Sequence, residues 1–373
     1  MDFLTEPEAR RLVESYMSLE RSSPSTQAIL DSGAIPRLRD YIVRPGKVSD
    51  SIFGGKGSYF VKQDGKLVEI KFENSPLETP DRIPLRLMVR TERISTHDIN
   101  RGEIPFKDQI LGVNHNFMVR LVRDVLGTSQ FDVEGLEDSS VVIAAENLNP
   151  FQFENVLRAY MAKSTTSTSL YQAWLRKEER FSGHLIPEGL IPNGPLPYIM
   201  DTPSTKSEVR DETVDRIYLA MNGFCTHEEY DQMRNAGLVA FGIVTQFLRE
   251  KGLILVDTKT EHGRNRKDQI VSQDELYTID SSRFWLRKDY EGQLERLARG
   301  EIKELYPISY SKEFARGMAE GENGFTEEQR IQIAVRYIMA IQHLTGTRFV
   351  PDIRSREERV IYGLRTALEK LVA

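Results

Sequence analysis

The charged residues between positions 253 and 285 are the part of this sequence best suited to chemistry. The segment reads LILVDTKTEHGRNRKDQIVSQDELYTIDSSRFW, and it places Asp257, Lys259 and Glu261 at every second position. Alternate residues of a β-strand point to one face, so these three side chains should lie together. A returning strand would bring Asp274 and Glu275 close to them. Because Mg²⁺ takes oxygen ligands from carboxylates and nucleotide phosphates, the segment suits a site for Mg²⁺ and a nucleotide.

The same pattern has a second interpretation, a solvent-exposed hairpin whose charges form ion pairs with one another. The four residues before Asp257 are Leu, Ile, Leu and Val, which is typical of an interior strand. An interior strand would leave the charged residues at its carboxyl end, where they could face a ligand. This context favours the functional interpretation.

The elements that must position this segment can be predicted from its flanks. Thr226 and Glu229 fit a capping box, and Gly252 fits the glycine that commonly follows a helix, which predicts a helix over 226–251. Strands are expected over 253–261 and 269–278, and a second capped helix is expected over 326–344. Further strands are predicted over 58–62, 67–72, 85–90 and 141–145, with mixed strand and helix character over 150–161.

The remaining patterns suggest how the chain is organised. Residues 1–43 are helical in pattern, with helices expected over 6–17 and 28–42, and another helix is expected over 107–125. The polar segment 127–140 is the best candidate for a domain boundary. The proline-rich segment 181–206 is expected to be an ordered loop.

Composition excludes several classes of protein. The chain has 373 residues, of which 39% are apolar and 28% charged, with a formal net charge of −6. It is long enough for two or three folded units, too apolar to be disordered, and too acidic for a broad nucleic-acid surface. The single cysteine, Cys225, excludes an internal disulfide and a cysteine-built zinc site, and we expect it to be a buried apolar residue. With no apolar run near ~20 residues and no signal-peptide pattern, we expect no nucleic-acid or membrane partner and a cytoplasmic location.

The charged segment and its flanks resemble those of a known family. Residues 253–285 are similar to the pattern LILxDTKxEFG…DExxTPDSSRFW of the phosphoribosylaminoimidazole-succinocarboxamide synthases, or SAICAR synthetases. Other motifs of that family occur in the same order over residues 44–349. They are GKVSD (46–50), TERISTHD (91–98), IPFK (104–107), ENVLRAYMAKS (154–164), PEGL (187–190), TPSTK (202–206) and LTG (344–346).

The resemblance implies a fold class and a division of the chain. The fold would be α/β (α+β), SAICAR synthase-like and ATP-grasp-like, with two lobes, a nucleotide cleft between them and C-terminal helices. Residues 1–43 would be an N-terminal helical extension and 44–130 a β-rich nucleotide-binding lobe. Residues 131–305 would be a central ATP-grasp-like lobe with the metal and substrate site, and 306–373 a C-terminal helical segment.

The resemblance also implies the reaction. The family joins carboxyaminoimidazole ribotide and L-aspartate to give SAICAR, ADP and phosphate, and an acyl phosphate is the plausible intermediate. The cofactors would be ATP and Mg²⁺, the partners would be these small molecules, and a homo-oligomer is possible. Such a phosphoryl transfer depends mainly on positioning and on neutralisation of charge.

Individual roles follow from the matching positions. ATP would be bound by Gly46, Lys47, Ser49, Lys206 and Lys259, and Mg²⁺ by Glu261 and Asp274. The substrates would be bound by Arg158, Ser164, Arg283, Ser95 and Asp98, and the catalytic pair would be Lys259 and Asp257.

Several of these residues also have an ordinary structural interpretation. Arg158 could pair with Glu154 four residues earlier, Lys47 could belong to a turn capped by Asp50, and Arg283 could be a surface residue beside Asp280. Lys206, in a loop rich in Pro, Ser and Thr, is the weakest assignment.

The sequence departs from the family mainly around the expected acceptor region. Ser49 replaces a cation of the nucleotide loop, and His97 replaces a phenylalanine. Lys163 replaces a glycine, no tryptophan follows Ser164, and Arg210 replaces a histidine. Because Lys163 and Arg210 add positive charge, we expect an anionic acceptor amine, aspartate first, with glutamate or a related diacid as alternatives.

Three other functions remain open at this stage. One is a related ligase with a different carboxylate or amine substrate. Another is a small-molecule kinase, because D-x-K-x-x-x-G also resembles the core of inositol polyphosphate kinases. The third is a nucleotide-binding relative without catalysis. ADP release measured with and without aspartate would separate the kinase from the ligases.

Overall fold

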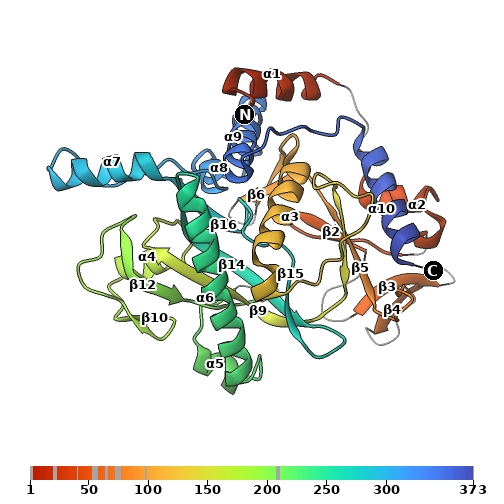
Figure 1. The fold of residues 1–373 in the computed structure, drawn as a ribbon, viewed down its shortest axis with the longest axis horizontal. Helices are drawn as coiled ribbons and strands as arrows, with labels where there is room; N and C mark the ends of the chain where they lie inside the picture. The colour runs from red at the N-terminus through yellow and green to blue at the C-terminus, as the bar shows by residue number, and fades with distance from the viewer. Residues whose placement is uncertain are drawn as a thin grey trace.

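The computed structural model describes residues 3–19, 23–39, 41–52, 58–63, 66–71, 77–96, 99–206 and 211–372. Residues 64–65, between the strands predicted over 58–62 and 67–72, and the residues His97, Asp98 and Arg210 lie outside this described part. Two antiparallel sheets, one of four strands and one of six, carry most of the strands (Figure 1). The mixture of antiparallel sheets and helices confirms the α+β class.

The smaller sheet has the strand order β1-β2-β5-β8. Its strands are β1 (Arg44–Pro45), β2 (Ser49–Ser51), β5 (Leu85–Arg90) and β8 (Val142–Glu146). Two hairpins occur between the strands of this sheet in the chain but form separate two-stranded sheets. They are β3 (Ser58–Gln63) with β4 (Lys66–Lys71), and β6 (Arg93–Thr96) with β7 (Ile99–Glu103). We expect the first lobe to end at position 130, but β8, which belongs to this sheet, lies beyond that position. The division of the chain into four segments stays a prediction.

The larger sheet positions the charged segment. Its order is β12-β9-β14-β15, with β13 also on β9 and β16 also on β14. The strands are β9 (Asn149–Tyr160), β12 (Pro195–Asp201), β13 (Ser204–Thr205), β14 (Leu253–Arg264), β15 (Ile270–Gln273) and β16 (Ser282–Leu286). A small hairpin, β10 (Arg180–Phe181) with β11 (His184–Leu185), is separate. Strand β14 is therefore hydrogen-bonded to β9 on one side and to β15 and β16 on the other.

Helices cover the sheets and enclose the core. Helix α6 (His227–Glu250) packs on β14 and on α3 (Lys107–Leu126), and α3 packs on α9 (Glu327–Thr345). In Figure 1, α6 crosses the larger sheet while α2 (Thr26–Asp31) and α10 (Arg356–Leu371) lie near the smaller one. The other helices are α1 (Glu6–Met17), η1 (Pro36–Leu38), α4 (Leu170–Leu175), α5 (Arg216–Met221), α7 (Arg287–Ala298) and α8 (Glu313–Gly317). Among the described residues, no helix has both the length and the apolar character that a membrane span requires.

Most sequence-based element predictions are confirmed. Thr226 and Thr326 both cap their helices with complete capping boxes, and Gly252 follows α6 with a φ of +71°. Strands β5, β8 and β14 and helices α1 and α3 occur where the patterns predict them. Cys225 is buried, and burial raises the pKa of its thiol to about 11, so it behaves as an apolar residue.

Three element predictions are wrong, each for a local reason. The expected helix over 28–42 ends at Asp31, because Gly33 has a φ of +76° and Pro36 starts a separate 3-10 turn. The segment 181–206 is not a simple loop, since β12 forms within it. Pro195 is tolerated because it is the first residue of a strand at the edge of the sheet.

The third wrong prediction concerns the strand expected over 269–278. Strand β15 stops at Gln273, because Asp274 with a φ of +55° and Tyr277 with a φ of +48° adopt left-handed backbone conformations. This exit from the ladder turns the chain at Asp274, one of the predicted metal ligands. The segment that follows, 278–282, forms a tight turn into β16.

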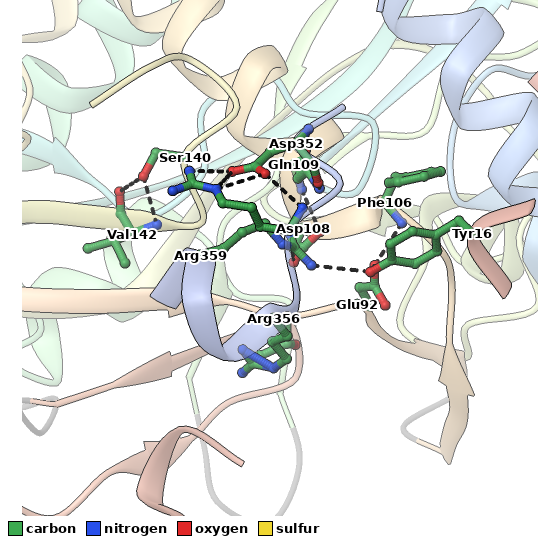
Figure 2. Close-up of polar contacts among 12 residues, drawn as sticks. Tyr16, Glu92, Phe106, Asp108, Gln109, Ser140, Val142, Asp352, Arg356 and Arg359 are labelled. Carbon is green, nitrogen blue, oxygen red and sulfur yellow. Dashed lines mark hydrogen bonds and ion pairs between the residues drawn. The ribbon is translucent and has the colours of Figure 1, made fainter. Parts of the chain in front are cut away.

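Away from the sheets, a buried polar network joins three helices at the start of α3 (Figure 2). Arg359 of α10 donates to Asp108 of α3 at 2.8 Å and to the hydroxyl of Tyr16 of α1 at 3.3 Å. Tyr16 in turn donates to Glu92 at 3.2 Å, and the backbone N–H of Phe106 donates to the same carboxylate oxygen at 2.8 Å. The network therefore connects the first and the last helix of the described chain to α3 and to Glu92.

Candidate active site

A cavity of about 350 Å³ opens beside the charged part of β14. The larger sheet contributes residues of β9, β14 and β16 to its wall, and the segment 311–316 closes another side. Two residues from the first part of the chain also line the cavity. They are Lys47, just before β2, and Ser95, in β6. The cavity thus brings together residues that are far apart in the sequence.

Two arginines share one carboxylate in this cavity. In the register of the sheet, Asp257 of β14 lies directly opposite Arg158 of β9 and Arg283 of β16. Nη1 of Arg158 lies 3.1 Å from Oδ2 of Asp257, and Nε of Arg283 lies 2.9 Å from Oδ1. Burial alone would raise the pKa of Asp257, but Arg283 and Arg158 outweigh it and hold the pKa below its usual value. Asp257 therefore stays ionised and holds both guanidinium groups in place.

The arginine pair is fixed by further contacts. Nε of Arg158 donates to the hydroxyl of Thr202 at 3.0 Å, and Nη1 of Arg283 donates to the carbonyl of Lys163 at 3.2 Å. The second contact connects the pair to Ser164, which also lines the cavity. Two fixed guanidinium groups against one carboxylate leave an excess of positive charge, which suits a phosphate.

Lys259 lies on the same face of β14, two residues farther along. Its Nζ is 2.7 Å from Oε1 of Glu154, and both residues line the cavity. Although burial would lower the pKa of Lys259, Glu154 and Glu261 raise it to about 12, so the ammonium group is permanently charged. Glu154, which the sequence suggested only as a partner for Arg158, is therefore the partner of Lys259.

Glu261 and Asp274 lie next to the cavity rather than in its wall. Glu261 of β14 is directly opposite Glu154 of β9, and it forms an ion pair with Lys206. Nη1 of Arg86, which sequence analysis did not identify, lies 3.0 Å from Oδ1 of Asp274. Arg86 is in β5, and no sequence motif marks it.

The chemistry of this acidic pair fits a divalent cation. Burial, followed by the nearby carboxylate of Asp274, raises the pKa of Glu261 to about 7, whereas Arg86 and Lys206 hold the pKa of Asp274 below its usual value despite its burial. Within the described residues, no group of three or more acidic, histidine or cysteine side chains could hold a metal. Two carboxylates match the way Mg²⁺ is bound with substrate phosphates and water as its other ligands.

The predicted nucleotide loop forms a tight turn. The N–H of Gly46 donates to the carbonyl of Ser49 at 2.9 Å, and a Cβ at Gly46 would overlap that oxygen. Arg93 donates to the carbonyl of Gly46 at 2.7 Å and to Asp50 at 2.5 Å. Lys47 therefore reaches the cavity from a turn that only glycine can form, while Asp50 is engaged by Arg93.

The contacts of Arg283 decide one structural interpretation that the sequence left open. Arg283 is not a surface residue beside Asp280, because Arg283 binds Asp257 while Asp280 binds Lys107 at 2.9 Å. Lys163 is not part of the cavity wall, and its Nζ lies 2.7 Å from Oε2 of Glu304. The expectation that Lys163 and Arg210 favour an anionic acceptor stays a prediction, because Arg210 lies outside the described part of the chain.

Comparisons with known proteins identify the family of this chain. A model of the family described as SAICAR synthetase matches residues 77–328. The chain is 31% identical to the chloroplastic phosphoribosylaminoimidazole-succinocarboxamide synthase of Arabidopsis thaliana, over 76% of this chain and 69% of that protein. It is also 31% identical to the synthase of Legionella pneumophila (strain Lens), over 76% of this chain and 89% of that protein.

Solved structures show the same fold. A SAICAR-synthase from Saccharomyces cerevisiae complexed with SAICAR superposes with a TM-score of 0.64 at 20% identity, covering 88% of this chain and 99% of the other. A type-2 SAICAR synthetase in complex with ADP superposes with a TM-score of 0.55 at 17% identity, covering 83% and 100%. By its sequence motifs, its matches and its fold, this chain belongs to the SAICAR synthetase family.

Proposed function

We propose that this protein joins carboxyaminoimidazole ribotide to L-aspartate with the conversion of ATP to ADP and phosphate. As a member of the SAICAR synthetase family, it is an ATP-dependent ligase of purine biosynthesis. The observation that carries the finer assignment is the arginine pair on Asp257 beside Lys259 in a single cavity. This arrangement offers one subsite for a phosphate and an adjacent cation for a carboxylate.

The proposed reaction has two steps. An oxygen of the ribotide carboxylate attacks the γ-phosphorus of ATP, and ADP leaves, which gives an acyl phosphate. The amine nitrogen of the acceptor then attacks the carbonyl carbon, phosphate leaves, and the nitrogen loses a proton. Both steps require the reacting groups to be aligned and their negative charges balanced, rather than a covalent contribution from the protein.

The residues of this chain would align the two substrates as follows. Arg158, Arg283 and Ser164 would bind the 5′-phosphate of the ribotide, while Asp257 keeps the two arginines in position. Lys259 would face the ribotide carboxylate and the γ-phosphate, which lowers the repulsion between them. Ser95 and Asp98 remain proposed substrate contacts.

The ATP phosphates would lie along the loop at 46–49, with Gly46, Lys47 and Ser49, and would reach Lys206 on the opposite side. Glu261 and Asp274 would hold Mg²⁺, which when bound neutralises phosphate charge. The support for this is the chemistry of the two carboxylates and the position of Lys206 against Glu261. A cytoplasmic location and a possible homo-oligomer are also proposals, and the Arabidopsis relative is described as chloroplastic.

The test is an assay of ADP release from the purified full chain with ATP, Mg²⁺, ribotide and aspartate, and with each component left out in turn. We expect release to require both the ribotide and aspartate, and a product whose mass equals the two together less one water. ADP release with the ribotide but without any amine, together with a phosphorylated product, would support the kinase alternative instead.

A further inference from the structure

The nucleotide loop, which contains Gly46 and Lys47, is held by the segment that follows β5. The carbonyl of Gly46 accepts a hydrogen bond from Nη2 of Arg93 at 2.7 Å, and the carbonyl of Val48 accepts one from the hydroxyl of Thr91 at 2.8 Å. A carbonyl oxygen carries partial negative charge and repels a phosphate, and these contacts engage two such oxygens within the protein. Lys47, which lines the cavity, can then determine the charge that the loop presents there.

The guanidinium group of Arg93 is fixed in turn by one buried carboxylate. Nη2 of Arg93 also donates to Oδ1 of Asp50 at 2.5 Å, and the side chain of Asp50 is only 4% exposed. Asp50 lies in β2, four residues after Gly46. A single nitrogen of Arg93 therefore connects the start of the loop to the strand that follows it.

The other oxygen of Asp50 is held by two helices from opposite ends of the sequence. The hydroxyl of Thr26, the first residue of α2, donates to Oδ2 of Asp50 at 2.6 Å. Nη2 of Arg356, the first residue of α10, donates to the same hydroxyl at 3.0 Å and lies 3.8 Å from Oδ2. Thr26 is fully buried, the side chain of Arg356 is 9% exposed, and neither residue is part of the cavity wall.

From these contacts we infer that Thr26 and Arg356 are positioning residues for ATP, which act on the nucleotide loop through Asp50 and Arg93. The inference rests on the proposed function, which places the ATP phosphates along this loop. It extends the nucleotide site to two helices outside residues 77–328, the part of the chain that the family model matches. The hydroxyl of Thr26 orients the carboxylate of Asp50 so that its other oxygen meets Arg93. Without this hydroxyl, the carboxylate can rotate toward Arg356, and the loop loses its support.

The test compares Thr26→Val, which removes the hydroxyl and nearly keeps the shape of the side chain, with Thr26→Ser, which keeps the hydroxyl. Calorimetry measures the affinity of the purified full chain for ADP with Mg²⁺, without ribotide or aspartate. We expect Thr26→Val to weaken ADP binding by about 3- to 10-fold, as for the net loss of one hydrogen bond, and Thr26→Ser to stay within about twofold of the wild type.

Steady-state kinetics separate the two substrates. The KM for ATP should rise in Thr26→Val by the same factor as the ADP dissociation constant. The KM for the ribotide should stay within about twofold, because Arg158 and Arg283 are held by Asp257 and not by the nucleotide loop.

Two further comparisons separate positioning from a purely structural role. Arg365→Gln is the matched control, because Arg365 also connects α10 to the N-terminal segment, by donating to the carbonyl of Ala34 at 2.9 Å, and takes no part in the contacts of Asp50 described above. Its ADP affinity should equal that of the wild type. In the background of Arg93→Gln, where the connection to the loop is already broken, Thr26→Val should cause no further loss of ADP affinity.

Three outcomes would overturn the inference: unchanged ADP affinity in a folded Thr26→Val, an equal loss in Arg365→Gln, or a full additional loss in the Arg93→Gln background. Thermal unfolding of each variant is measured in parallel. If Thr26→Val does not fold, Arg356→Met carries the test with the same expected loss, because it removes the cation and its hydrogen bond to Thr26. Failure of the proposed function gives a different result, since the wild-type protein would then form no product from ribotide and aspartate, while the comparison of ADP affinities would still hold.

Discussion

A single carboxylate, Asp257, fixes two guanidinium groups in the candidate active site. The two strands that flank β14 determine this contact, because Arg158 of β9 and Arg283 of β16 lie opposite Asp257 on either side of β14. Each arginine also has another anchor, Thr202 or the carbonyl of Lys163. The two guanidinium groups are therefore held in place before any ligand arrives, which reduces the entropy lost on binding.

The first prediction concerns this pair. Arg158→Ala and Arg283→Ala should each raise the KM for the ribotide by about 10- to 150-fold, because a charged, bidentate contact to phosphate is lost, and should change the KM for ATP little. Steady-state kinetics with each substrate varied would measure this. Arg216→Ala, at an exposed ion pair with Asp231, is the control. A loss of ATP affinity with unchanged ribotide affinity would mean that the two subsites are assigned the wrong way round.

The second prediction concerns the acidic pair. Glu261→Gln and Asp274→Asn should each lower kcat by at least about 100-fold, since each removes a charge that would bind Mg²⁺. Both variants should remain folded, because each replacement is nearly isosteric. Turnover and circular dichroism would be measured together. Asp268→Asn, in the same hairpin but with its side chain 83% exposed, is the control, and normal activity in the Glu261 or Asp274 variant would exclude that residue from the site.

At the scale of elements, close packing determines how near the C-terminal helix lies to the smaller sheet. Helix α10 approaches β8 at Gly363, where a Cβ would lie 2.6 Å from Cγ2 and 2.8 Å from Cβ of Val142. In contrast, a Cβ at Gly292 of α7 would meet no atom within 4 Å. A methyl group added at Gly363 would therefore overlap its neighbours, whereas one added at Gly292 would not.

The third prediction uses this contrast. Gly363→Ala should lower the free energy of unfolding by about 1–3 kcal/mol, because the added methyl group overpacks the contact between α10 and β8. Gly292→Ala should instead raise it by about 0.5–1 kcal/mol, because alanine is the better helix former. Urea denaturation of both variants would measure this. Equal effects of the two substitutions would show that α10 can shift away from β8 without loss.

At the scale of the whole molecule, the network in Figure 2 connects α1 and α10 to the start of α3. Helix α3 follows the hairpin of β6 and β7, and β6 contributes Ser95 to the cavity. Burial, followed by the carboxylate of Asp108, raises the pKa of Glu92 to about 8. The other charged groups that face it are Arg359 and Glu103, and the hydroxyl of Tyr16 contacts it directly. Glu92 is thus protonated in the folded protein at neutral pH.

The fourth prediction follows from this protonation. Between about pH 4.5 and pH 8 the folded protein keeps a proton on Glu92 that the unfolded chain releases, so the contribution of Glu92 to stability falls as the pH rises. From pH 6 to pH 8, the wild-type protein should therefore lose about 2 kcal/mol more than Glu92→Gln, which has no proton to lose. Chemical denaturation at both pH values measures the difference. Glu14→Gln, at an exposed site, should behave as the wild type does, and an identical loss in the Glu92 variant would contradict the prediction.

The sequence by itself determined the features that depend on near neighbours. Capping boxes at Thr226 and Thr326 fixed where two long helices begin, because the groups that satisfy each other are three residues apart. Alternation along β14 predicted that Asp257, Lys259 and Glu261 share a face. The order of the motifs identified the family. The ends of β15 and of the second helix were predicted wrongly, because backbone angles at Asp274 and Gly33 decided them.

Only the tertiary structure decided which cation meets which carboxylate. Arg158 and Asp257 are 99 positions apart, and Lys206 and Glu261 are 55 apart. Arg86 has no local pattern that distinguishes it from a surface residue. An alternating pattern tells which face of a strand a side chain occupies, but strand register and loop paths determine what lies opposite. For this reason the acidic residues of the site could be predicted from the sequence. The cation that pairs with each of them and fixes its position could be known only from the fold.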